Sequence, residues 1–128
     1  MMSTILVVDD RPNARYTMVR TLTAAGFDVR ETATGRDALR LARMQPNAIV
    51  LDIALADMDG FEVCRRLKTD SVTRGIPVIH KTAVFHDNEH RQRGLAAGAD
   101  DYLVEPFEPT TLVAAVRRVL GDGRDGGG

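Results

Sequence analysis

Five short runs along the chain are strand candidates, most of them rich in apolar and β-branched residues, and segments with helical spacing separate them. Several of the runs are apolar at consecutive positions, which is typical of strands that helices cover on both faces. Strands that alternate with helices imply right-handed crossovers and one mostly parallel sheet. We therefore expect an α/β fold with a doubly wound, five-stranded parallel sheet, its strands over 4–8, 27–31, 48–51, 76–82 and 102–104.

The segments between the runs carry signals that begin and end helices. Pro12 suits a first helical turn, apolar residues then recur about every 3.6 positions, and Gly26 suits the helix end. The last helix is expected from Pro109, with an apolar stripe that reaches Leu120. Three further helices are expected: one from Thr34-Gly35 that stops before Pro46, one carrying Phe61, Cys64 and Leu67, and one over 87–97.

Length and composition limit the classes of protein to which the chain can belong. Its 128 residues suit one domain, expected over 1–120, and the Gly-rich segment 121–128 is expected to be a flexible tail or linker. No apolar run approaches the roughly 20 residues that span a bilayer. The single cysteine cannot form an internal disulfide, so we expect a cytoplasmic protein without membrane contact. A net charge of -1 offers no general attraction for nucleic acid, and no direct nucleic-acid partner is expected.

Acidic residues follow three of the predicted strands. Asp9 and Asp10 follow the first, Asp52 the third and Glu105 the fifth, while Thr82 ends the fourth. The carboxyl ends of parallel strands meet at the edge where open α/β sheets bind ligands. At about 5 Å and an effective dielectric near 20, two carboxylates repel by roughly 3 kcal/mol. The three aspartates therefore need a divalent cation, Mg²⁺ or Mn²⁺ for oxygen ligands, unless one stays protonated. Taken singly, each aspartate could equally cap a helix and face water.

Four segments carry a resemblance that covers almost the whole chain: ILVVDD at 5–10, IVLDIALADMDGFEVCRRLK at 49–68, IPVIHKTA at 76–83 and GLAAGADDYLVEPF at 94–107. In their order and spacing, the chain resembles the receiver domain of two-component response regulators. The resemblance implies the flavodoxin-like form of the expected fold. It implies a histidine kinase or a phosphotransfer protein as partner. The chain would be a stand-alone receiver or part of a longer protein, with kinase or effector domains as further partners.

The resemblance also implies a role for each polar residue at the sheet edge. Asp52 would be the phosphoacceptor, Thr82 the switch hydroxyl and Tyr102 the aromatic side chain that changes rotamer with it. The phosphoryl group would then repack the surface of the helix over 87–97, the last strand and the last helix. Such a domain catalyses its own aspartyl phosphorylation at most. Magnesium would be held by the carboxylates of Asp9, Asp10 and Asp52 and by the backbone carbonyl of Ala54.

Glu105 departs from the family pattern, which has a lysine before the proline that follows the fifth strand. Replacing that ammonium by a carboxylate is expected to disfavour phosphorylation or to demand tighter metal binding, and Glu105→Lys is expected to speed it. Lys81 is a possible substitute cation. However, strand alternation places it on the face opposite Thr82, so that substitution would need an irregular strand end. The Glu105-Pro106 bond is expected to be cis, as it commonly is in the family.

Two functions remain open at this point: a phosphoaccepting receiver, and a pseudo-receiver that acts only through protein contact. A flavin module would need a phosphate cradle, which the acidic segment after the first strand does not offer. An aspartate-nucleophile phosphatase would need an Asp-x-Asp pattern there. Cys64 is expected to be a core residue, and His86 and His90 to lie on a solvated face. A homodimer through the surface named above would pair Arg117 and Arg118 with Asp100 and Asp101.

Overall fold

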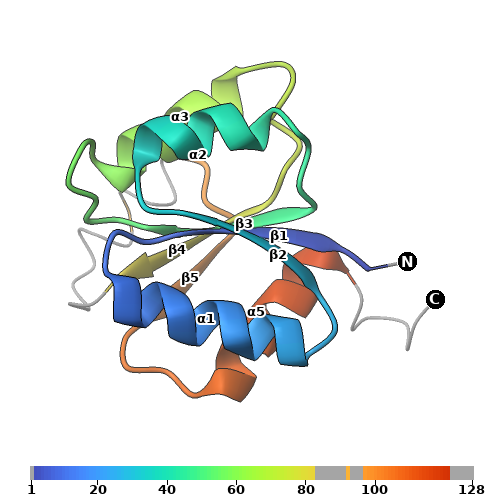
Figure 1. The fold of residues 1–128 in the computed structure, drawn as a ribbon. Helices are drawn as coiled ribbons and strands as arrows, with labels where there is room; N and C mark the ends of the chain where they lie inside the picture. The colour runs from blue at the N-terminus through green and yellow to red at the C-terminus, as the bar shows by residue number, and fades with distance from the viewer. Residues whose placement is uncertain (1, 83–91, 93–96, 122–128) are drawn as a thin grey trace.

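The computed structural model describes residues 2–82, 92 and 97–121. One parallel sheet has the strand order β2-β1-β3-β4-β5 (Figure 1). This confirms the expected doubly wound, five-stranded sheet. Its strands are β1 (Thr4–Val8), β2 (Asp28–Thr32), β3 (Ala48–Asp52), β4 (Val78–Thr82) and β5 (Asp101–Val104). The helices with described bounds are α1 (Pro12–Ala24), α2 (Gly35–Ala42), α3 (Gly60–Thr69) and α5 (Pro109–Leu120).

The helices cover both faces of the sheet and divide the core in two. Helices α1 and α5 lie on one face, and α2 and α3 lie on the other (Figure 1). Successive strand residues point to opposite faces. In β3, Val50 therefore packs in the cluster beneath α1 and α5, whereas Ile49 and Leu51 pack beneath α2 and α3. All five residues of β3 are buried, as the run of consecutive apolar residues predicts.

The observed element bounds differ from the predicted ones by a few residues. Phe27, expected in a strand, lies in the turn that ends α1, where its N–H donates to the Leu22 carbonyl across Gly26, whose φ is 99°. The fourth strand begins at Val78 rather than Ile76, whose N–H donates to the Thr73 carbonyl in a turn. The helix expected over 87–97 lies outside the described residues, apart from positions 92 and 97, and His86 and His90 also lie outside them.

The segment between β3 and α3 is held close to the end of β3. The Asp57 carboxylate accepts from the N–H groups of Gly35 and Arg36 at the start of α2. A Cβ atom at Gly60 would clash with the Asp52 carbonyl oxygen, so only glycine allows α3 to begin there. These contacts fix the backbone that follows Asp52. Among the described residues, no helix is long and apolar enough to cross a membrane.

Candidate functional site

Three aspartates lie together at the carboxyl edge of the sheet. One carboxylate oxygen from each of Asp9, Asp10 and Asp52 lies within 4.8 Å of the others. Asp9 is fully buried and Asp52 is 3% exposed, so water screens these two charges little. The predicted convergence of the three carboxylates is therefore confirmed, and the arrangement fits a divalent cation with oxygen ligands.

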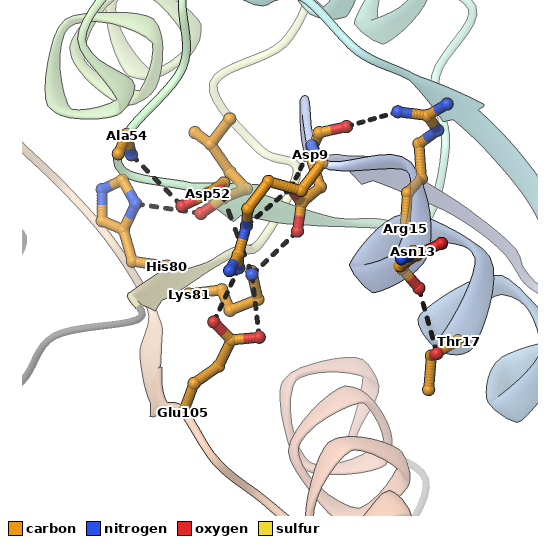
Figure 2. Close-up of polar contacts among 11 residues, drawn as sticks. Asp9, Asn13, Arg15, Thr17, Asp52, Ala54, His80, Lys81 and Glu105 are labelled. Atoms are coloured by element: carbon orange, nitrogen blue, oxygen red, sulfur yellow. Dashed lines mark hydrogen bonds and ion pairs between the residues drawn. The ribbon is translucent and has the colours of Figure 1, made fainter.

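Backbone groups orient two of these carboxylates. The Arg11 N–H donates to Asp9 Oδ1 at 2.9 Å, and the Ala54 N–H donates to Asp52 Oδ1 at 3.2 Å. The guanidinium of Arg15 holds the Asp9 carbonyl at 2.7 Å (Figure 2). Each carboxylate thus keeps its second oxygen, Oδ2, for other partners.

Lys81 supplies a buried cation to this cluster. Its Nζ lies 2.8 Å from Asp9 Oδ2, 3.1 Å from Glu105 Oε2 and 3.9 Å from Asp52 Oδ2, and its side chain is fully buried. A buried ammonium is costly unless carboxylates pair with it. The three acidic neighbours meet that requirement, and Figure 2 shows Lys81 between Asp9 and Glu105.

The predicted separation of Lys81 from the acidic cluster is wrong, although the alternation on which it relied is correct. Lys81 and Thr82 do lie on opposite faces of β4. However, β3 and β4 are in a register that pairs Asp52 with Lys81, so both side chains point toward α1 and α5. The acidic cluster therefore lies on the Lys81 side of the sheet, and no irregular strand end is needed.

Glu105 joins the cluster from the segment after β5. Its N–H donates to the Thr82 carbonyl at 2.8 Å, which extends the pairing of β4 with β5 by one step. Its Oε1 lies 2.7 Å from Arg11 Nη2, a contact that the sequence reasoning missed. Burial disfavours the charged form of Glu105, but the Arg11 hydrogen bond and the Lys81 charge outweigh it, and the pKa of Glu105 falls below its ordinary value. The Glu105-Pro106 bond is cis, as predicted.

The electrostatic balance of the site leaves negative charge in excess. Burial raises the pKa of Asp52 to about 6, with Lys81 opposing the shift and Asp9 reinforcing it. With Glu105, the cluster of three aspartates contains four carboxylates. The described residues place two cations, Lys81 and Arg11, within ion-pair distance of them. When all four carboxylates are ionised, two negative charges stay unbalanced. A divalent cation would neutralise them.

The residues expected to form a switch lie on the other face of the sheet. Tyr102 pairs in register with His80, and Thr82 pairs with Val104, so Tyr102 and Thr82 share a face. His80 is fully buried there, with Nδ1 3.5 Å from the Leu51 carbonyl oxygen, and burial lowers its pKa to about 4. Thr82 and Tyr102 thus have the placement that a linked rotamer change would need.

Cys64 lies in the core as predicted, whereas Arg118, expected to pair across a homodimer, pairs within the chain. Cys64 is a buried core residue, and burial raises the pKa of its thiol to about 11. Arg118 pairs with Asp101 of the same chain at 2.5 Å, and Asp100 pairs with Lys68 at 2.9 Å. These intrachain pairs occupy the acids expected to contact a second copy, so the homodimer stays a prediction.

Comparison with known proteins identifies the same family. The family described as "Response regulator receiver domain" matches residues 5–117. The DNA-binding dual master transcriptional regulator RpaA of Synechocystis is 40% identical over 93% of this chain, and the DNA-binding response regulator MtrA of Mycolicibacterium smegmatis is 40% identical over 94% of it. The chain spans about half the length of these relatives, 49% and 51% respectively.

One solved structure of a similar receiver domain contains magnesium. The receiver domain of a sensor histidine kinase from Pseudomonas aeruginosa, described with a magnesium ion coordinated in its active-site cleft, is 31% identical to this chain. The two superpose with a TM-score of 0.86, over 94% of this chain and 99% of that one. Together with the acidic edge of the sheet, these matches show that the chain belongs to the response regulator receiver domain family of two-component signal transduction.

Proposed function

We propose that Asp52 accepts a phosphoryl group from the phosphohistidine of a histidine kinase or a phosphotransfer protein. The observation that carries the proposal is the grouping of Asp9, Asp10 and Asp52 within 4.8 Å, with the Lys81 ammonium beside them. Such a site concentrates an oxygen nucleophile, a metal-binding donor set and a fixed cation. These are the parts that phosphoryl transfer requires.

The donor set fits Mg²⁺, or Mn²⁺ in its place. The carboxylates of Asp9, Asp10 and Asp52 are hard oxygen ligands in close proximity, and the excess negative charge favours a divalent ion. The backbone carbonyl of Ala54 would complete the protein's contribution. When bound, the ion neutralises charge on the nucleophile and on the incoming phosphoryl group.

The Asp52 carboxylate would act as an in-line nucleophile. A carboxylate oxygen forms the new bond to phosphorus while the phosphorus–nitrogen bond of the phosphohistidine breaks, and the electron pair leaves with the imidazole. Asp52 must be ionised to attack. Its pKa of about 6 leaves most of the population ionised at neutral pH. Lys81 would keep its proton and stabilise the added negative charge.

Thr82 and Tyr102 would carry the response to phosphorylation. The Thr82 hydroxyl would donate to a phosphoryl oxygen, and Tyr102 would change rotamer on the same face of the sheet. The surface formed by residues 87–97, β5 and α5 would then repack for a partner. A homodimer, or kinase or effector domains of a longer protein, would read this surface.

Direct labelling tests the proposal. The wild-type chain with Mg²⁺ and a small phosphodonor, or with a phosphorylated histidine kinase, should acquire one acid-stable, base-labile phosphoryl group, whereas Asp52→Asn should acquire none. Intact-mass spectrometry measures both. If no donor labels the wild type, the phosphoacceptor function is contradicted and the pseudo-receiver alternative takes its place.

The partners of the domain can be proposed from its relatives. RpaA and MtrA are named as DNA-binding proteins, and this chain matches about half of each. We propose that the domain described here contacts other proteins in the cytoplasm rather than nucleic acid or membrane. Electrophoretic mobility shift with the isolated chain should show no DNA binding at physiological salt.

A further inference from the structure

Glu105 holds two cations, one with each carboxylate oxygen. Its Oε2 lies 3.1 Å from Lys81 Nζ (Figure 2), and its Oε1 lies 2.7 Å from Arg11 Nη2. Lys81 comes from β4, Arg11 from the segment between β1 and α1, and Glu105 from the segment after β5. A single carboxylate therefore links three chain segments that surround Asp52.

We infer that Lys81 and Glu105 form an exchanged pair. The family has its lysine at the position of Glu105, whereas in this chain β4 supplies the ammonium beside the acceptor, as Lys81, and Glu105 positions that ammonium. The inference rests on the proposed function of Asp52. It assigns Glu105 a positioning role, because its carboxylate pairs with both Arg11 and Lys81 and does not simply repel the Asp52 carboxylate.

The contacts around Glu105 show how it could fix the ammonium. Glu105 is anchored independently of Lys81, by the Arg11 guanidinium and by its backbone hydrogen bond to the Thr82 carbonyl. Without Glu105, the flexible Lys81 side chain could move Nζ toward Asp9, with which it makes its shortest ion pair, 2.8 Å. A second carboxylate across from Asp9 holds Nζ between them, where it lies 3.9 Å from Asp52.

In phosphoryl transfer, this pair would make no bond to phosphorus. The oxygen–phosphorus bond forms at Asp52 as the phosphorus–nitrogen bond of the donor breaks, and Lys81 stays protonated throughout. The ammonium would attract the phosphoryl oxygens by charge. Glu105 would act only through Lys81.

Three variants test the exchange: Lys81→Met, Glu105→Lys, and the two together. Each single variant should be phosphorylated at least tenfold more slowly than wild type by a small phosphodonor at saturating Mg²⁺. Glu105→Lys should be slow because it brings a second ammonium to Lys81, which reverses the expectation drawn from the sequence alone. The double variant again has one ammonium and should recover most of the rate, at least fivefold above Lys81→Met.

Lys68→Met is the matched control, because it removes an ammonium that pairs with Asp100 away from the acidic cluster. Its phosphorylation rate should equal that of wild type. A double variant no faster than Lys81→Met, or a Glu105→Lys variant as fast as wild type, would overturn the exchange.

A second measurement separates this inference from the proposed function. The free energies of unfolding of the same variants, without metal or donor, report the pairing alone. If the pair is exchanged as inferred, the double variant should lose less stability than the two single losses together; additive losses would contradict the pairing. If the wild type is never phosphorylated while the losses in unfolding free energy are non-additive, the phosphoacceptor function is contradicted but the Lys81–Glu105 pairing is supported.

Discussion

Two neighbouring residues of β4, His80 and Lys81, are both fully buried polar side chains, yet they lie on opposite faces of the sheet in opposite environments. Lys81 faces three carboxylates. His80 packs edge-on against Phe61, with ring centroids 5.2 Å apart, and its Nε2 has no hydrogen-bond partner among the described residues. A buried side chain at the end of β4 can therefore carry a charge on the face where carboxylates converge, as Lys81 does. On the other face, where the described residues include no such cluster of carboxylates, the buried His80 side chain is neutral.

The largest effect on the free energy of unfolding is expected from removing the Lys81 ammonium from the face that carries the carboxylates. Lys81→Met leaves the buried Asp9 carboxylate without its closest cation, and breaking a buried pair in this way costs about 3–5 kcal/mol. Chemical denaturation of the metal-free protein measures this loss. Added Mg²⁺ should restore part of it, because the ion replaces the missing positive charge. A loss below about 1 kcal/mol would show that the ammonium contributes no more than an exposed pair does.

A smaller, pH-dependent effect is expected on the His80 side. The pKa of His80 is about 4 in the folded chain, below its ordinary value of 6.5, so between these values the unfolded state binds the proton and the folded state does not. Stability from His80 is therefore present above pH 6.5 and is lost as the pH falls toward 4, by up to about 3 kcal/mol.

The comparison with His80→Met isolates this contribution, because Asp52 also titrates in the same range. The difference in unfolding free energy between wild type and the variant should change steadily from pH 7 to pH 4. A difference that stays constant across this range would show that His80 is not held neutral in the folded protein.

The smallest effect is expected at an exposed pair. Arg118→Ala removes the ion pair with Asp101, in which the Arg118 side chain is 62% exposed, and should cost no more than about 1 kcal/mol. Thermal unfolding of this variant beside Lys81→Met measures the contrast directly. Equal losses in the two variants would mean that burial does not distinguish the two ion pairs.

The fold and the acidic cluster could be predicted from local sequence, whereas the positions of the cations around the cluster could not. Consecutive apolar residues identify β1 and β3, and the acids that follow the strands must meet at one edge of a parallel sheet. The face on which Lys81 lies depends on the register between β3 and β4, which no local pattern specifies. The Arg11–Glu105 pair joins residues 94 positions apart, and only the order of the strands brings them together.

A crystal structure of the chain with Mg²⁺ and a phosphoryl mimic such as beryllofluoride tests the central claim most directly. We expect the metal on the carboxylates of Asp9, Asp10 and Asp52, the mimic on Asp52, and Lys81 Nζ within hydrogen-bond distance of the mimic. A mimic bound to Asp52 with Lys81 turned away, or a metal that leaves any of the three aspartates uncoordinated even through water, would contradict it.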